Sequence, residues 1–177
     1  MRYARRVTLF NLRNVRLRPG EEFHDTLPVE LEPLELGGQR YLPVPDSPEA
    51  SFTVGRATSG TVFRLSFEAS LVGPCVRCLG DAVIRIRVDA TEYQAEHPDS
   101  DELRTPYLVD GRCLDLSAWA RDAVVLSLPD KILCRDDCAG LCAGCGADLN
   151  REACSCAPAE PEGAFAKLAE LKDLLGG

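Results

Sequence analysis

The chain has 177 residues, of which 45% are hydrophobic and 27% are charged, and its formal net charge is −8. This composition is typical of a soluble globular protein of one domain with a small appendage, and it excludes a disordered or collagen-like chain. No apolar run approaches the roughly 20 residues of a membrane helix. The apolar stretch Val7 to Phe10 is too short for a secretory signal, so we expect a cytoplasmic protein with no membrane contact.

Basic residues are concentrated at the N-terminus. Residues 1–20 contain six arginines and no acidic residue, so residues 21–177 carry 14 basic and 28 acidic side chains, a formal charge of −14. A body this negative does not bind nucleic acid by nonspecific phosphate neutralisation, and it attracts basic partners such as ribosomal proteins. The N-terminal segment is either an arm that contacts phosphates or a strand with a solvated basic face. Its arginines are Arg2, Arg5, Arg6, Arg13, Arg16 and Arg18.

The first part of the chain is expected to form short extended segments. We predict a strand over residues 5–10, a turn at Pro19-Gly20 and a second extended segment near residues 27–36. Residues 37–50 contain Gly37-Gly38 and three prolines, and we predict a loop there.

The clearest periodicity follows. Apolar residues alternate with polar residues from Phe63 to Leu71 and again from Ile84 to Val88, which indicates two half-buried strands. The short connection between them holds Cys75 and Cys78. We therefore predict an antiparallel hairpin with both thiols at its tip.

The second part is predicted to contain two helices. Residues 92–106 are polar and acidic and are expected to form an exposed loop. Asp115 or Ser117 is the predicted N-cap of a helix that stops at Pro129. A second helix is predicted from Glu162 to Leu175, with a stripe of alanine and leucine on one side.

Together these elements predict an α+β fold: an antiparallel β-sheet or small open barrel with two helices and a cysteine-rich, zinc-binding C-terminal segment. The expected division is a β-rich domain over residues 1–130 with the C-x-x-C hairpin and one helix, a zinc-binding segment over 131–160, and a terminal helix within 161–177.

The nine cysteines form four close pairs and one single residue. Two thiolates that lie two to four residues apart are able to grip one zinc ion, because a tight turn aims both sulfurs at a shared point. Four pairs supply eight ligands, enough for two tetrahedral Zn²⁺ sites. The pairs are Cys75/Cys78, Cys134/Cys138, Cys142/Cys145 and Cys154/Cys156, and Cys113 stands alone.

Spacing favours one way of combining the pairs. Eight residues separate Cys145 from Cys154, which suits a local site formed by the last two pairs. Cys134 and Cys138 are then left for the hairpin pair, so a metal ion would close a loop of more than 50 residues. A separate local site from Cys134 to Cys145 remains an alternative, and the spacing leaves open whether one or two ions bind.

Other uses of the thiols are less favoured. Disulfides are rare in a reducing compartment. The two cysteines of a thioredoxin-like redox pair lie at the start of a helix, whereas Cys75 and Cys78 are expected between strands. Four cysteines alone do not distinguish zinc from an iron–sulfur cluster. Cys113 is expected to be a small buried hydrophobic residue.

These motifs resemble those of the bacterial large ribosomal RNA subunit accumulation protein family (YceD-like). The resemblance is carried by Cys75-Val76-Arg77-Cys78-Leu79, Asp115-Leu116, Leu126-Ser127-Leu128-Pro129, the run Cys138-Ala139-Gly140-Leu141-Cys142-Ala143-Gly144-Cys145-Gly146-Ala147-Asp148-Leu149-Asn150, Cys154-Ser155-Cys156 and the ending Phe165-x-x-Leu168-x-x-Leu171. It implies a role in accumulation of large-subunit (23S) ribosomal RNA and in ribosome assembly, without a known catalytic activity.

The residues agree with a protein that is not an enzyme. Closed four-thiolate sites keep no coordination position for a substrate, and the sequence holds no H-E-x-x-H, phosphate-binding glycine loop or nucleophile elbow. The leading hypothesis is an assembly factor that holds a basic ribosomal protein or a pre-ribosomal particle. Asp136-Asp137 are either solvated acidic residues or a point of contact for a basic partner. The alternatives are direct rRNA binding through the N-terminal arginines and, from another class, a thiol oxidoreductase.

Overall fold

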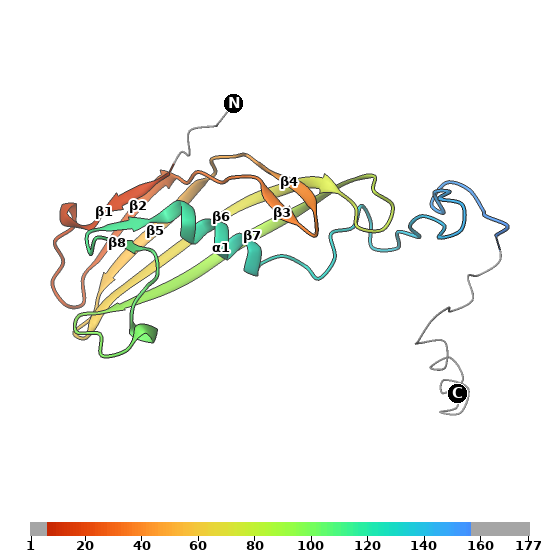
Figure 1. Cartoon of the computed structure of the whole chain (residues 1–177). Coiled ribbons are helices and arrows are strands. Elements are labelled where there is room, and N and C mark those ends of the chain that lie inside the picture. Colours follow the sequence, from red (N-terminus) through yellow and green to blue (C-terminus); the bar gives the residue numbers. More distant parts are fainter. Residues whose placement is uncertain (1–6, 157–177) are drawn as a thin grey trace.

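The computed structural model describes residues 7–156, which form two antiparallel sheets, one α-helix and a cysteine-rich segment beyond one end of the larger sheet (Figure 1). Two short 3-10 helices, η1 (Leu12–Asn14) and η2 (Asp101–Leu103), lie in connections. The strands are β1 (Leu9–Asn11), β2 (Glu22–Pro28), β3 (Leu34–Leu36), β4 (Gln39–Val44), β5 (Glu49–Arg56), β6 (Gly60–Pro74), β7 (Asp81–Ala95), β8 (Leu108–Val109) and β9 (Cys113–Asp115), and the helix is α1 (Leu116–Leu126).

The larger sheet is organised around β6. This strand pairs with β7 along its full length, from Gly60 opposite Ala95 to Pro74 opposite Asp81. Its other edge is shared, because β5 pairs with its first half and β4 with its second half. β2 extends the sheet beyond β5, and β3 extends it beyond β4. Among the described strands no pairing joins β2 to β7, so the sheet is open rather than a closed barrel.

The alternation predicted from the sequence is present in β6. Its apolar side chains from Phe63 to Leu71 are buried on one face, and Arg64, Ser66 and Glu68 are exposed on the other. Helix α1 covers the buried face and contributes Trp119, which is 2% exposed, to the same hydrophobic core. The two layers therefore bury one continuous core, because each element has a single apolar face.

Helix α1 begins where the sequence predicts. The Asp115 carboxylate accepts a hydrogen bond from the backbone N–H of Ala118 (2.9 Å), which satisfies a donor of the first turn. At the other end, the Ser127 hydroxyl donates to the carbonyl oxygen of Ala123 (2.7 Å), and Pro129 follows. Among residues 7–156 no helix combines the length and the apolar character of a membrane span.

The smaller sheet ties the N-terminal segment to this helix. β9, which leads directly into α1, lies between β1 and β8. The Leu116 N–H donates to the carbonyl oxygen of Thr8 (3.0 Å), and the Leu12 N–H donates to that of Arg112 (2.9 Å). Residues that are 100 or more positions apart are therefore held together at the same end of the molecule as η1.

Several boundaries differ from the predictions. The loop prediction for residues 37–50 is wrong, because β4 and the start of β5 lie there. Pro43 is tolerated since this part of β4 pairs with β6 on one side only. The extended segment near 27–36 is two strands separated by an irregular stretch, and the expected exposed loop begins only after Ala95. Of the predicted strand over residues 5–10, residues 5 and 6 lie outside the described part of the chain, and among residues 7–10 only Leu9 and Phe10 lie in β1.

The described residues contain one α-helix, whereas the sequence predicts two. The second predicted helix, Glu162 to Leu175, lies outside the described residues. The architecture is therefore antiparallel sheets with one covering helix, to which the cysteine-rich segment is attached.

Candidate metal centres

Eight cysteine sulfurs gather into two groups of four. The proximal cluster, at the end of the larger sheet, consists of Cys75, Cys78, Cys134 and Cys138. The distal cluster, farther along the chain, consists of Cys142, Cys145, Cys154 and Cys156. Within each group all sulfurs lie within 4.8 Å of one another. The grouping is the one that spacing favours, and the alternative local site from Cys134 to Cys145 is not formed.

The C-x-x-C turn presents two thiols of the proximal cluster. It joins β6 to β7, so the predicted hairpin with both thiols at its tip is confirmed. The Cys75 N–H donates to the carbonyl oxygen of Gly80 (2.7 Å), and the Leu79 N–H donates to that of Cys75 (2.9 Å). Leu79 has a positive φ of 60°, the left-handed conformation that closes this tight turn.

The chain after α1 returns to the hairpin with the other two thiols. The Val76 N–H donates to the carbonyl oxygen of Ile132 (3.0 Å), which holds the returning segment beside the turn. The Sγ atoms of Cys75 and Cys138 are 3.8 Å apart, and those of Cys78 and Cys134 are 3.7 Å apart. Because zinc–sulfur bonds of about 2.3 Å place tetrahedral ligands about 3.8 Å apart, these distances fit a four-thiolate zinc site.

The distal cluster is built on a small turn of its own. Leu141 and Asp148 form an antiparallel bridge, and the Cys142 N–H donates to the carbonyl oxygen of Ala147 (2.8 Å). Inside this turn the Gly146 N–H donates to the carbonyl oxygen of Cys142 (2.8 Å), with Gly146 at φ 74°. The Sγ of Cys154 lies 3.3 Å from that of Cys142 and 3.4 Å from that of Cys145, slightly closer than tetrahedral zinc ligands.

Backbone N–H groups point at sulfur in both clusters. The N–H of Arg77 lies 3.5 Å from the Cys75 Sγ, and that of Gly144 lies 3.4 Å from the Cys142 Sγ. In the distal cluster the Cys156 N–H also lies 3.3 Å from the Cys154 Sγ. Such donors stabilise thiolate and orient metal ligands.

The thiol pKa values reflect this arrangement. Burial raises the pKa of Cys75, but the backbone N–H groups of Cys78 and Arg77 outweigh it and lower the pKa to about 6. The backbone N–H groups of Cys145 and Gly144 lower the pKa of Cys142 to about 6.

A neighbouring thiol in each cluster behaves in the opposite way. Burial, and then the adjacent Cys138 and Cys78, raise the pKa of Cys134 to about 12. In the distal cluster, the Cys156 N–H lowers the pKa of Cys154, but the three surrounding thiols outweigh it and raise the pKa to about 12. Several thiolates at one point repel one another, and a bound dication removes that cost.

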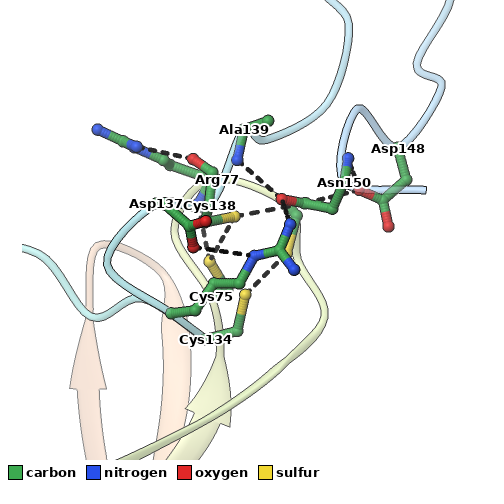
Figure 2. A network of polar contacts seen from close by, with 10 residues as sticks. Cys75, Arg77, Cys134, Asp137, Cys138, Ala139, Asp148 and Asn150 are labelled. Atoms are coloured by element: carbon green, nitrogen blue, oxygen red, sulfur yellow. Dashed lines mark hydrogen bonds and ion pairs between the residues drawn. The ribbon is translucent and has the colours of Figure 1, made fainter. Parts of the chain in front are cut away.

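A polar network joins the proximal cluster to Asn150 and Asp148 of the distal turn (Figure 2). Asn150, from the distal turn, accepts hydrogen bonds at Oδ1 from the Ala139 N–H and from the Arg135 guanidinium, each at 2.8 Å. Its Nδ2 lies 3.5 Å from the Cys138 Sγ and donates to Asp148 Oδ1 (2.7 Å). Hydrogen bonds from the Asn150 backbone N–H (3.0 Å) and then from its side-chain amide lower the pKa of the Asp148 carboxyl group.

Arg77 makes the second link between the clusters. Its guanidinium donates to the carbonyl oxygen of Cys138 (2.7 Å), and its own carbonyl oxygen accepts from the Leu141 N–H (3.2 Å). Gly140 has φ 80° and lies so close that an added Cβ would be 3.2 Å from the Arg77 carbonyl oxygen. Arg77 and Asn150 were not predicted as site residues, and their places in the motifs that carry the resemblance were the only signal for them.

The remaining predicted site residues lie elsewhere. All nine cysteines belong to the described part of the chain and are free thiols. Cys113 lies in β9, opposite Asn11 and Val109, and is half-buried rather than buried. Arg13, Arg16 and Arg18 are exposed, whereas Arg2, Arg5 and Arg6 lie outside the described residues.

The fold and the clusters define a β-rich protein that carries two four-cysteine centres able to hold metal ions. Sequence comparison identifies the family to which this protein belongs. The family described as large ribosomal RNA subunit accumulation protein YceD matches residues 63–172, which include all eight clustered cysteines. The chain belongs to this family, as its motifs indicated.

Individual relatives support the assignment. Uncharacterized proteins of Mycobacterium tuberculosis and Mycobacterium bovis are each 36% identical over 149 residues, covering 76% of this chain and 67% of theirs. The large ribosomal RNA subunit accumulation protein YCED homolog 1, chloroplastic, of Arabidopsis thaliana is 33% identical over 60 residues, which are 34% of this chain and 19% of that protein. No solved structure gives a significant match.

Proposed function

We propose that this protein is a non-catalytic factor that supports accumulation of 23S ribosomal RNA and assembly of the large ribosomal subunit. The observation that carries this proposal is the family match over residues 63–172, whose description names large-subunit rRNA accumulation. The matched Arabidopsis relative carries the same description. Assembly of ribosomal subunits in a bacterium takes place in the cytoplasm, and we propose that location for this protein.

The two clusters are proposed to hold one Zn²⁺ each. Sulfur–sulfur distances of 3.7 and 3.8 Å in the proximal cluster support a tetrahedral site, and N–H donors support thiolate in both clusters. With four thiolates bound, zinc has no open position for water or substrate, so its role is structural. In the proximal cluster it ties the β6–β7 hairpin to the segment after α1.

The proposed direct partner is a basic ribosomal protein, alone or within a pre-ribosomal particle. The supporting observation is charge, since residues 21–177 carry −14 before any thiolate is counted. Two sites of four thiolates and one dication each would add about −4. Asp136 and Asp137 are exposed beside the proximal cluster, although Asp137 also pairs with Arg135 at 3.2 Å. Such a surface accelerates encounter with a basic protein.

One observation favours the alternative of direct rRNA contact. Arg13, Arg16 and Arg18 are exposed. They belong to the connection between β1 and β2, two strands that lie at the end of the molecule away from the cysteine-rich segment (Figure 1). A thiol oxidoreductase is the less supported alternative, because Cys75 and Cys78 lie in a turn between strands rather than at the start of a helix.

The proposal is tested in a strain that lacks the gene. We expect its 23S rRNA level to fall relative to 16S rRNA and to be restored by the wild-type chain. Affinity-tagged protein should co-purify with large-subunit proteins or pre-ribosomal particles. Normal 23S rRNA in the deletion strain, together with no enrichment of either component, would refute the proposed function.

A further inference from the structure

A cleft of about 630 Å³ lies at the arginine-rich end of the molecule, opposite the cysteine clusters. Its lining comes from the segment that follows η1 and from the facing ends of β5 and β6. The volume is in the range of small-molecule binding sites. The lining residues are Leu12, Val15, Arg16, Leu17, Arg18, Glu21, Val54, Arg56 and Thr61.

Backbone hydrogen bonds fix the segment that forms the rim. The Gly20 N–H donates to the carbonyl oxygen of Arg56 (2.7 Å), and the Arg56 N–H donates to that of Glu21 (3.0 Å). The Glu21 N–H donates to the carbonyl oxygen of Arg18 (3.0 Å), which closes the turn at Pro19-Gly20. The rim is thus anchored to the end of β5 and is not a free arm.

Two guanidinium groups at the cleft are not neutralised by a neighbouring carboxylate of the described residues. Arg56 pairs with Glu96 at 2.8 Å, and the Glu21 carboxylate accepts a hydrogen bond from the Arg18 backbone N–H at the same distance. Within residues 7–156, the side chains of Arg16 and Arg18 have no ion-pair partner and are exposed. Unpaired arginines on an otherwise acidic protein form a local site for anions.

The floor of the cleft is apolar. Along the segment, exposed Arg16 and Arg18 alternate with half-buried Val15 and Leu17, and Val54 of β5 is 3% exposed. An apolar floor in a cleft that is also lined by arginines matches a nucleotide, whose base is a flat apolar surface and whose phosphates accept bidentate bonds from arginine. An inorganic anion would use the arginines but leave the floor uncovered.

We propose that this cleft binds a segment of single-stranded RNA, with a base over Val15, Leu17 and Val54 and flanking phosphates on Arg16 and Arg18. The inference rests on the proposed function for the identity of the RNA, since a ribosomal RNA factor meets unpaired rRNA during assembly. It adds a second contact to the particle, remote from the acidic surface proposed to hold a basic protein.

The test uses the full-length, metal-loaded chain and a short fluorescent single-stranded oligoribonucleotide, with anisotropy measured across a range of salt concentrations. Two lost phosphate contacts in the double variant Arg16→Ala/Arg18→Ala should weaken binding on the order of tenfold or more and reduce the salt slope by about 1.4. The matched control, Arg85→Ala/Arg87→Ala, removes two exposed arginines from β7 and should bind as the wild type does. Val15→Ser, which removes apolar surface from the floor of the cleft and keeps every arginine, should also weaken binding, with thermal melting confirming that each variant folds.

Three outcomes would overturn the inference. The first is no RNA binding by the wild type, and the second is equal weakening by the control pair. The third is equally strong binding of a labelled oligoglutamate peptide, which would assign the cleft to acidic peptides. If the wild-type chain still restores 23S rRNA in the deletion strain, such a failure refutes the cleft and leaves the proposed function intact.

Discussion

The side-chain amide of Asn150 lies 3.5 Å from the sulfur of Cys138, so a residue of the distal turn supports a ligand of the proximal cluster. The same amide accepts the Ala139 N–H and donates to Asp148, which leaves its orientation fully determined. The two clusters are therefore separate as ligand sets, and Asn150 links the distal turn to the proximal cluster (Figure 2).

Asn150→Ala should weaken metal binding in the proximal cluster although no ligand is changed. Loss of a hydrogen bond to a metal ligand costs about 10- to 100-fold in affinity. We expect a decrease of this size in competition with a chromogenic chelator. Asn14→Ala, at an exposed position in η1, is the matched control and should leave affinity unchanged. Unchanged affinity in Asn150→Ala would show that the amide does not support the cluster.

The two clusters should differ in their effect on the stability of the sheet. Cys75 and Cys138 are 0% exposed and belong to the hydrophobic core, whereas Cys145 and Cys156 of the distal cluster are exposed. Cys75→Ser/Cys138→Ser should lower the Tm of the zinc-loaded protein by about 4–8 °C, equivalent to about 2 kcal/mol. Cys145→Ser/Cys156→Ser should lower it less. A larger decrease for the distal pair, measured by circular dichroism of the strands, would contradict this ranking.

Gly73 should not tolerate a side chain. A Cβ at this position would collide with the ring of Tyr41, which is 1% exposed and whose hydroxyl donates to the carbonyl oxygen of Pro74 (2.9 Å). Gly73→Ala should destabilise the protein by about 1–3 kcal/mol through overpacking. Gly55→Ala, where the added Cβ meets only the Glu22 side chain at 3.4 Å, should cost less in the same denaturant titration. Equal stabilities for the two variants would argue against the placement of Tyr41.

Tyr107 should make stability depend on alkaline pH. Burial and then the Asp122 carboxylate, which accepts its hydroxyl hydrogen bond at 3.2 Å, raise the pKa of Tyr107 to about 12. The neutral phenol therefore stabilises the fold below pH 10, and this contribution is lost as the pH rises from 10 toward about 12. Tyr107→Phe removes one hydrogen bond and should cost about 1 kcal/mol near pH 8. The difference in unfolding free energy between the two proteins should shrink at pH 11, and a constant difference would contradict the raised pKa.

Patterns local in sequence predicted much of the fold. Alternation from Phe63 to Leu71 identified β6, and Asp115 with Pro129 bounded α1, because period and capping are properties of neighbouring residues. β4 was missed because proline and glycine in residues 37–50 indicate a loop. Its pairing with β6 is a tertiary contact, which overrides local propensity.

The candidate site, too, was predicted where it depends on neighbouring residues and missed where it depends on contacts between distant segments. Cysteine spacing was enough to identify the four pairs and favoured the observed grouping, since two thiols in one turn lie close together, but it left a local site from Cys134 to Cys145 open. The link through Asn150 and the anchored cleft around Arg16 depend on contacts between distant segments, so spacing alone carried no signal for them.

We infer that the eight clustered sulfurs bind two metal ions, one of which joins distant parts of the chain. Native mass spectrometry of freshly purified protein, combined with elemental analysis, tests it directly. We expect the mass of the wild-type chain to include two zinc ions. Each of the variants Cys75→Ser/Cys78→Ser and Cys154→Ser/Cys156→Ser should retain one zinc ion. A wild-type chain that carries no metal, or that carries iron and sulfide instead of zinc, would contradict it.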